Sequence, residues 1–371
     1  MNSMDQKEKR LDRVEGCLVG GACGDALGYE IEFMDEPSIF SRFGKAGIQD
    51  FELDRRTGKA LISDDTQMTM FTAEGLILGR EKWKKSRKDN TAEESCMKTL
   101  LNAVLQSYED WLITQETSFR AWGKEVSSYH NPDSELMKEP ELFVPRAPGN
   151  TCLSALDYRR DHPWKEDTFL HSPINRSKGC GGIMRTAPAA LLYWPEASID
   201  EIEKLSAELA AITHTHPLGW LPSALLGRIL YRILLEDSDP LREIIRQENE
   251  VIERKYAHLH QTRTLTSLIR KAIELSETEK PDLECIHELG EGWVAEETLA
   301  IAVYCALRHE DDFSKAITAS VNHRGDSDST GAVCGNLLGA WIGYQNIPEK
   351  WKRNLQFAGL LRRLARELNG A

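Results

Sequence analysis

Two short segments far apart in the chain combine carboxylates with hydroxyls, and we expect the chemistry there. The first reads SDDT at residues 63–66 and the second reads DSDS at residues 326–329. Carboxylate and hydroxyl oxygens suit hard cations such as Mg²⁺, Mn²⁺ or Ca²⁺. Taken singly, either segment is better explained as the first turn of a helix, with Ser as cap and Asp complementing the helix dipole. If the two converge, their four carboxylates repel one another, and a dinuclear metal site is the natural compensation.

Helices must position these segments, because helical periodicity dominates the sequence. In residues 10–28 apolar side chains recur every three or four positions, and residues 198–214 repeat the pattern behind Ser198, a suitable N-cap. Alternating strand patterns with hairpin turns are absent from the sequence. Glycines at four-residue steps, as at Gly335 and Gly339, favour close packing of helix backbones over a functional role. We therefore predict an all-α fold.

One domain is predicted to span residues 1–371, since no Pro/Gly/Ser-rich linker divides the chain. Three segments are expected to lie outside its helical core. Residues 1–12 form a flexible N-terminus and residues 80–95 a charged, solvent-facing loop insertion. Residues 123–148, rich in Pro, Asn and Glu, form a second and longer loop insertion with a functional role.

The composition argues against several classes of binding partner. The 371 residues carry a formal net charge of −13, which argues against non-specific binding to nucleic acid or to an anionic membrane. No run of ~18 apolar residues exists to span a membrane, and the charged N-terminus lacks the apolar core of a secretory signal. Eight scattered cysteines without a C-x-x-C pair favour free buried thiols over disulfides or zinc. We therefore expect a cytoplasmic protein.

The two acidic segments belong to a series of motifs that resembles the ADP-ribosylglycohydrolase family, which includes dinitrogenase-reductase-activating glycohydrolase. The series runs from Gly16 to Tyr344 and reads GCLVGGACGDALGYEIEF, ISDDTQMTM, RAPGNTCLSAL, SKGCGGIMRTAPAALL, ITHTHPLG and NHRGDSDSTGAVCGNLLGAWIG. The resemblance implies a single compact domain of orthogonally packed helices. It also implies a dinuclear site for two Mg²⁺ ions, or Mn²⁺ in some members, in a central cleft.

Carried over residue by residue, the resemblance implies three groups of site residues. The metal ligands are Ser63, Asp64, Asp65, Asp326, Asp328 and Ser329. The catalytic carboxylates are Asp64, Asp65 and Glu32, which matches a mobile glutamate near the scissile bond. The substrate contacts are Gly149, Asn150, Thr151, Ser177, Lys178, Gly179, Cys180, Gly181, His214, Gly292 and Trp293.

Within the last group, residues 149–151 are expected to line the diphosphate and ribose. Residues 177–182 form a Gly-rich loop that opens a helix and suits anion capture by backbone amides. His214 is expected near the adenosine part, and residues 292–293 beside the adenine. Simpler explanations stand beside these roles: the glycines permit a tight turn, His214 caps a helix C-terminus, and Trp293 is a half-buried aromatic. Asp25 is expected to pack or to position ligands rather than to bind the metal.

The resemblance implies a hydrolase that releases ADP-ribose from a modified protein side chain by attack of water at ribose C1″. N-linked ADP-ribosyl-arginine is the expected linkage, although Arg146 and Ala147 stand where some arginine-specific relatives carry an acid. Glu139 or Glu141 would then have to serve instead. The alternatives are a protein that binds ADP-ribose or neutralises an ADP-ribosyltransferase by direct contact, and a metal phosphohydrolase acting on the diphosphate. The expected partners are an ADP-ribosylated protein and ADP-ribose, with a transferase as a further candidate.

Overall fold

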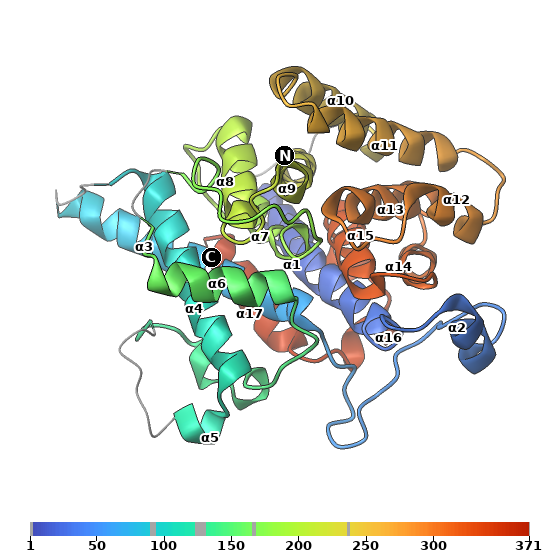
Figure 1. Cartoon of the computed structure of the whole chain (residues 1–371), viewed down its shortest axis with the longest axis horizontal. Helices are drawn as coiled ribbons and strands as arrows, with labels where there is room; N and C mark the ends of the chain where they lie inside the picture. Colours follow the sequence, from blue (N-terminus) through green and yellow to red (C-terminus); the bar gives the residue numbers. More distant parts are fainter. Residues whose placement is uncertain (1–2, 90–93, 123–130, 165–167, 236–237, 371) are drawn as a thin grey trace.

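Helices make up the regular structure of the computed structural model, which describes residues 3–89, 94–122, 131–164, 168–235 and 238–370. The predicted all-α fold is confirmed (Figure 1). The α-helices are α1 Ser3–Gly28, α2 Glu36–Phe43, α3 Asp64–Lys88, α4 Cys96–Glu116, α5 Phe119–Trp122, α6 Asn150–Asp161, α7 Pro188–Leu191, α8 Ile199–Ala211, α9 Pro217–Leu234, α10 Leu241–Lys255, α11 Gln261–Leu275, α12 Asp282–Leu289, α13 Ala295–Arg308, α14 Phe313–Val321, α15 Ser327–Ile342, α16 Glu349–Arg353 and α17 Ala358–Leu368. The described residues also form the short 3-10 helices η1 Leu136–Lys138, η2 Pro140–Leu142, η3 Ile183–Arg185 and η4 Tyr344–Asn346.

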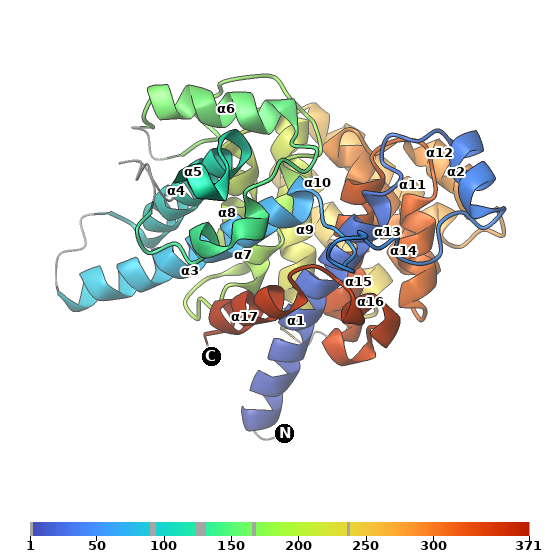
Figure 2. The same ribbon diagram turned by 90° about the horizontal axis from the view of Figure 1, so that it is seen from below.

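Helix α15 and the C-terminal part of α1 lie in the middle of the molecule, whereas the first turns of α1 project from it (Figure 2). Figures 1 and 2 show α3, α4 and α6 to one side of this pair and α12, α13 and α14 to the other. The buried apolar side chains form one continuous cluster that extends along the chain from Val14 to Leu368. No helix in the described residues is both long and apolar enough to cross a bilayer. The assignment of all 371 residues to one domain stays a prediction.

Glycines allow α1 and α15 to form the most extensive helix–helix contact of the fold. A Cβ atom on Gly24 would lie 1.9 Å from the carbonyl oxygen of Gly331, and one on Gly335 would lie 2.0 Å from that of Gly20. No side chain fits at such distances, so the helix backbones touch directly. The predicted close packing is therefore the structural role of these glycines. Because the two helices pack closely, the end of α1 lies against the start of α15.

The structure corrects two of the three predicted loop segments. Helix α1 already begins at Ser3, so most of the segment 1–12 is helical, and Arg10 anchors it by donating to the carbonyl of Leu191 at 3.0 Å. Helix α3 continues to Lys88, so residues 80–88 of the predicted insertion are helical as well. Lys, Arg and Glu in these segments are good helix formers, and their charge indicates exposure rather than a loop.

The third segment keeps its irregular character in the part that the structure describes. Residues 131–148 contain only the short helices η1 and η2. Residues 90–93 and 123–130 of the predicted insertions lie outside the described residues. Glu74 of α3 fixes the start of this segment, because its carboxylate accepts hydrogen bonds from the backbone of Glu135 at 2.8 Å and of Leu136 at 3.0 Å.

Candidate active site

The first acidic segment forms the N-terminus of α3. Ser63 is the N-cap, and its hydroxyl accepts from the amide of Asp65 at 3.1 Å. Asp25 near the end of α1 is fully buried, and its carboxylate accepts from the amides of Ser63 at 3.0 Å and Thr66 at 3.1 Å. The capping interpretation of Ser63 is therefore right, and Asp25 ties α3 to α1 as a positioning residue.

The second acidic segment forms the N-terminus of α15 and meets the first. Asp326 is the N-cap, accepting from the amide of Ser329 at 3.3 Å, and the same amide lies 2.9 Å from Oδ1 of Asp328. The hydroxyl of Ser329 donates to Oδ2 of Asp65 at 2.9 Å. This hydrogen bond joins two residues that are 264 positions apart in the sequence. The two acidic segments therefore converge, which the sequence alone had left open.

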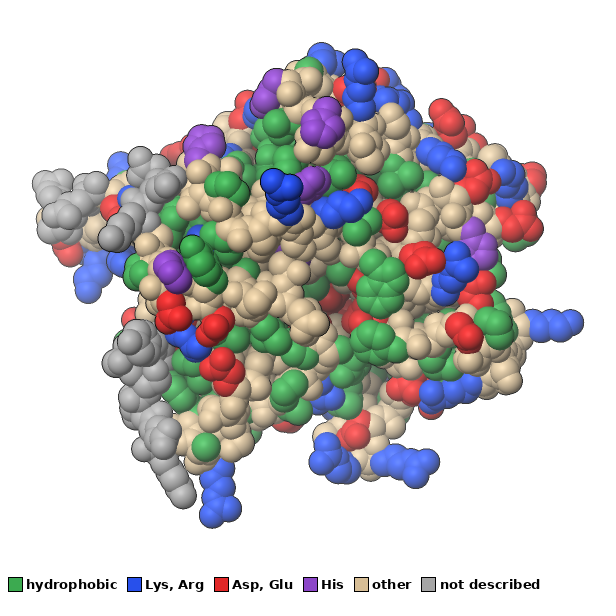
Figure 3. Space-filling model, viewed as in Figure 1, with side chains coloured by type: hydrophobic (Ala, Val, Ile, Leu, Met, Phe, Trp, Pro, Cys, Tyr) green, Lys and Arg blue, Asp and Glu red, His purple; other side chains and the backbone are tan. Residues whose placement is uncertain are grey.

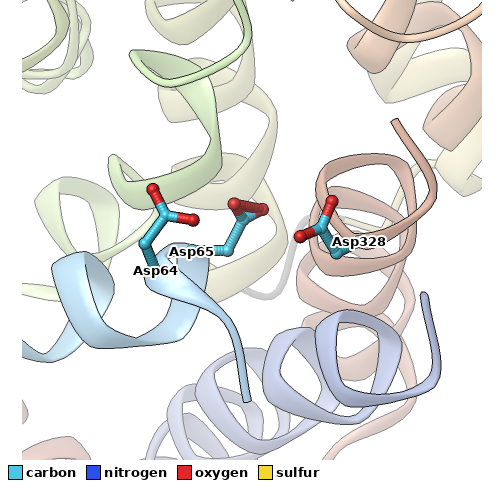
Figure 4. A group of neighbouring side chains, drawn as sticks. All are labelled: Asp64, Asp65 and Asp328. Atoms are coloured by element: carbon cyan, nitrogen blue, oxygen red, sulfur yellow. The ribbon is translucent and has the colours of Figure 1, made fainter. Parts of the chain in front are cut away.

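Asp64, Asp65 and Asp328 form a buried triad at this junction (Figure 4). Each offers a carboxylate oxygen, and these oxygens lie within 4.8 Å of one another. Burial, then the charge of Asp328, raises the pKa of both Asp64 and Asp65 well above the ordinary value. Across the described ranges no Lys or Arg side chain forms an ion pair with the triad. An all-oxygen donor set without a counter-charge fits a hard cation.

Asp326 and Glu32 extend this triad into an acidic group of five carboxylates. Asp326 lines the same cleft, where its Oδ2 accepts from the thiol of Cys180 at 2.6 Å. Glu32 follows α1 and is 8% exposed, and its Oε2 has no hydrogen-bond partner among the described residues. Burial and the charges of Asp328 and Asp326 raise the pKa of Glu32 to about 10. The other carboxylate at the end of α1, Glu30, is half-buried and forms an ion pair with Arg42 at 2.5 Å.

The acidic group opens into a cleft of about 200 Å³ (Figure 3). Figure 3 shows acidic side chains inside a hollow near the middle of this face, with hydrophobic side chains along its rim. Most of the predicted site residues line it. They are Glu32, Asp64, Asp65, Asp326, Asp328 and Ser329 from the acidic predictions, and Gly149, Asn150, Thr151, Gly179, Cys180, Gly181, His214 and Trp293 from the substrate predictions.

Four predicted residues do not line the cleft: Ser63, Ser177, Lys178 and Gly292. Ser63 is buried as the cap of α3, and Lys178 reaches away to Glu296 at 2.7 Å. Ser177 supports the cleft from behind, with its hydroxyl 3.2 Å from that of Thr151. Gly292 has a φ of +83° and lies against Asp326, where a Cβ would come within 3.4 Å of the Asp326 side chain. These residues position the cleft rather than line it.

Hydrogen-bond donors form a second group in the cleft. Gly149 caps α6, so Asn150 and Thr151 occupy the first turn of a twelve-residue helix, whose free amides favour anions. The Gly-rich loop contributes less than predicted, because it opens only the 3-10 turn η3 and not a longer helix. The amide of Cys180 already donates to the carbonyl of Trp293 at 3.3 Å. We refer to the first turn of α6, the amide of Gly181 and the ring of His214 as the donor group.

His214 lies in the loop between α8 and α9 and is 2% exposed. It is not a helix C-cap, since α8 ends at Ala211 with Ile212 as its cap. His216 caps the N-terminus of α9, where its Nδ1 accepts from the amide of Leu218 at 3.1 Å. Burial, with the positive charge of Arg185, lowers the pKa of His214 to about 3. The imidazole is therefore neutral in the cleft.

Three cleft residues were not predicted individually: Ala147, Cys152 and Met184. All three lie within motifs that the sequence singled out, so their position in those motifs was the available signal. Ala147 has a φ of +55°, and the neighbouring carbonyl of Arg146 accepts from the amide of Asp64 at 2.9 Å. Their apolar or weakly polar side chains gave no chemical reason to select them.

Comparison with known proteins agrees with this geometry. The model of the ADP-ribosylglycohydrolase family matches residues 6–371. The chain belongs to this family. It is 23% identical to ADP-ribosylhydrolase ARH1 of Dictyostelium discoideum, over 96% of this chain and 94% of the relative. It is 24% identical to ADP-ribosyl-[dinitrogen reductase] glycohydrolase of Rhodospirillum rubrum, over 93% and 90%.

A solved structure described as an ADP-ribosylglycohydrolase-related protein complex shares the fold. It superposes with a TM-score of 0.63 at 22% sequence identity, covering 98% of this chain and 99% of the other. The family resemblance inferred from the motifs is confirmed. Membership supports removal of ADP-ribose from modified substrates as the class of reaction, and the buried triad is able to hold a metal ion.

Proposed function

We propose that this protein is a metal-dependent hydrolase that removes ADP-ribose from a modified protein side chain. The observation that carries the proposal is the convergence of the two acidic segments in one cleft. The hydroxyl of Ser329 donates to Asp65 there, and three buried carboxylates lie within 4.8 Å of one another. The family match over residues 6–371 supports the same reaction class.

Two Mg²⁺ ions, or Mn²⁺ in their place, are the proposed cofactors. Asp64, Asp65 and Asp328 would hold them, with Asp326 and Ser329 completing the set and Ser63 supporting it as the cap of α3. When bound, such ions compensate the carboxylate charge, bind ribose hydroxyls and make water a better nucleophile. The ligand atoms that these side chains offer to a metal are all oxygens, which these cations prefer.

The remaining steps belong to side chains of the chain itself. Burial and the neighbouring carboxylates raise the pKa of Glu32, and bound cations would offset those carboxylates, so that Glu32 could ionise. Its unpartnered Oε2 would then be available to orient a water molecule and to accept its proton as it attacks ribose C1″. The bond from C1″ to the side-chain atom breaks through an oxocarbenium-like state, and the departing atom takes up the proton that the attacking water has given to Glu32. The first turn of α6 supplies amides for the substrate diphosphate, which explains how an acidic protein can hold an anion.

We further propose N-linked ADP-ribosyl-arginine as the linkage. Phe33 next to Glu32 is 76% exposed, and its ring lies 6.4 Å from that of Trp293 at an interplanar angle of 23°. A guanidinium stacks on such aromatic faces and pairs with a carboxylate. Glu141 lies outside the cleft, where its Oε2 accepts from Gln356 at 2.8 Å, so Glu32 is the acid that supports this proposal.

Incubation with ADP-ribosyl-arginine and ADP-ribosyl-serine proteins, with Mg²⁺ and with a chelator, tests the proposal. Release of intact ADP-ribose that depends on Mg²⁺ is expected, and it should be faster from arginine. Release of AMP would instead indicate a phosphohydrolase. Tight binding of ADP-ribose or of an ADP-ribosyltransferase without any release would indicate a binding or neutralising protein.

A further inference from the structure

Arg185 is fully buried beneath the cleft without a carboxylate partner in the described residues. It belongs to η3, and its guanidinium lies 4.5 Å above the ring of Tyr108. Nη1 lies 3.2 Å from the sulfur of Cys152, and Nη2 lies 2.6 Å from the hydroxyl oxygen of Thr213. A buried cation without a counter-ion is costly, so its presence points to a role in the adjoining site.

A short hydrogen-bond relay connects this cation to the cleft. A guanidinium only donates, so Nη2 of Arg185 must donate to Oγ1 of Thr213. The hydroxyl of Thr213 keeps one hydrogen, and Nδ1 of His214 lies 2.8 Å away to accept it. Because a neutral imidazole carries one proton, Nδ1 as acceptor leaves that proton on Nε2.

The Nε2 side of the His214 ring faces the Gly-rich loop. A Cβ on Gly179 would lie 3.3 Å from Nε2, and a Cβ on Gly181 would lie 2.9 Å from Cε1. Glycine at both positions therefore lets the ring lie against the loop. No protein hydrogen bond accounts for Nε2 among the described residues, and His214 lines the cleft beside Gly181 and the first turn of α6.

We propose that Arg185 and Thr213 are positioning residues that fix His214 as an Nε2–H donor to an anionic phosphate oxygen of the ligand. The hydrogen-bond geometry supports this, and so does the buried charge of Arg185, which favours an anion nearby. The low pKa of His214 agrees with a neutral donor. The inference rests on the proposed function in one respect, because it assumes that the ligand contains a diphosphate. It differs from the expectation that His214 lies beside the adenosine.

Two matched variants test the relay. Thr213→Val keeps the shape of the side chain and removes the hydroxyl, whereas Thr213→Ser keeps the hydroxyl. The ¹⁵N resonances of the His214 ring report the tautomer in the ligand-free protein. Nε2–H is expected in the wild type and in Thr213→Ser, and a mixed or Nδ1–H form in Thr213→Val. Nδ1–H in the wild type would overturn the proposal whether or not the protein hydrolyses anything.

Calorimetric titration with ADP-ribose and with adenosine, in Mg²⁺, tests the ligand contact. Thr213→Val should lose roughly tenfold in affinity for ADP-ribose, and Thr213→Ser less than threefold. Adenosine affinity should not change, since adenosine lacks the phosphates. An equal loss for adenosine, or full ADP-ribose affinity in Thr213→Val, would contradict the proposal. Thermal unfolding in Mg²⁺ checks the fold, and Arg185→Lys, which keeps a buried cation, provides a second variant should Thr213→Val unfold.

Discussion

The acidic group and the donor group of the cleft are built in different ways. Four of its five acidic residues come from two contiguous segments at the N-termini of α3 and α15, and the fifth, Glu32, follows α1. No basic side chain forms an ion pair with them in the described part of the chain. The donor group combines a helix N-terminus, one loop amide and a histidine backed by Arg185. The difference teaches that the charge of the first group must be offset by protons or by a cation, whereas the second group is built from protein donors alone and is suited to an anion.

Among the variants that test this comparison, removal of one triad carboxylate should have the largest effect, and that effect should be on turnover. Asp328→Asn keeps the size of the side chain and removes a charge that the cation requires, so turnover should fall by about 10³-fold or more. Steady-state release of ADP-ribose measures the change. Asp312→Asn, at the exposed N-cap of α14, is the matched control and should leave turnover unaltered. Normal turnover in Asp328→Asn would remove the basis for the metal site.

A methyl group between α1 and α15 should disrupt the packing of the two helices that position the acidic group. In Gly24→Ala the new Cβ would lie 1.9 Å from the carbonyl of Gly331, so the helices must separate. We expect a loss of about 1–3 kcal/mol in the free energy of unfolding, measured by urea titration. Gly359→Ala in α17 meets nothing within 4 Å and should be neutral or slightly stabilising. Equal effects of the two changes would contradict the close packing.

Stabilisation by Mg²⁺ should grow as pH rises. The pKa values of the acidic group are raised in the fold, that of Asp25 beneath it to about 7, mainly by burial. From about pH 4 upward these carboxyl groups bind more protons in the metal-free fold than in the unfolded chain, so their contribution to stability falls as pH rises. Bound Mg²⁺ would replace those protons.

The increase in Tm caused by Mg²⁺ should therefore be larger at about pH 8 than at about pH 5. An increase of about 3–6 °C is expected at ~100-fold excess over Kd. Differential scanning calorimetry measures it, with NaCl of equal ionic strength as the control. An increase that is greatest at low pH would contradict metal binding by these carboxylates.

The smallest expected effect concerns the aromatic rim. Phe33→Ala removes one of two rings available to a guanidinium, so KM for an arginine-linked substrate should rise about two- to fivefold. KM for a serine-linked substrate should change less. Tyr158→Ala, another exposed aromatic remote from the cleft lining, is the control. An equal rise for both substrates would mean that Phe33 does not select the linkage.

The sequence predicted those features that reside in contiguous patterns. Helical periodicity predicted the all-α fold, and the paired acidic segments predicted the triad, because residue type and spacing carried the chemistry. The role of Arg185 was not predictable in this way, since its significance comes from contacts with Cys152 and Thr213 on other elements. The error at residues 80–88 has a different cause, because a charged helix and a charged loop share one composition.

The contact between α1 and α15 also sets the order in which the site can be made. Asn336 of α15 donates to the carbonyl of Cys17 of α1 at 2.8 Å, and the two residues are 319 positions apart. During synthesis α1 leaves the ribosome long before its partner exists. Asp64 and Asp65 are synthesised before Asp328, so a nascent or truncated chain that lacks α15 holds only two of the three triad carboxylates. The proposed site is thus completed only after α15 has been synthesised, when long-range pairing with a high loop-closure cost becomes possible.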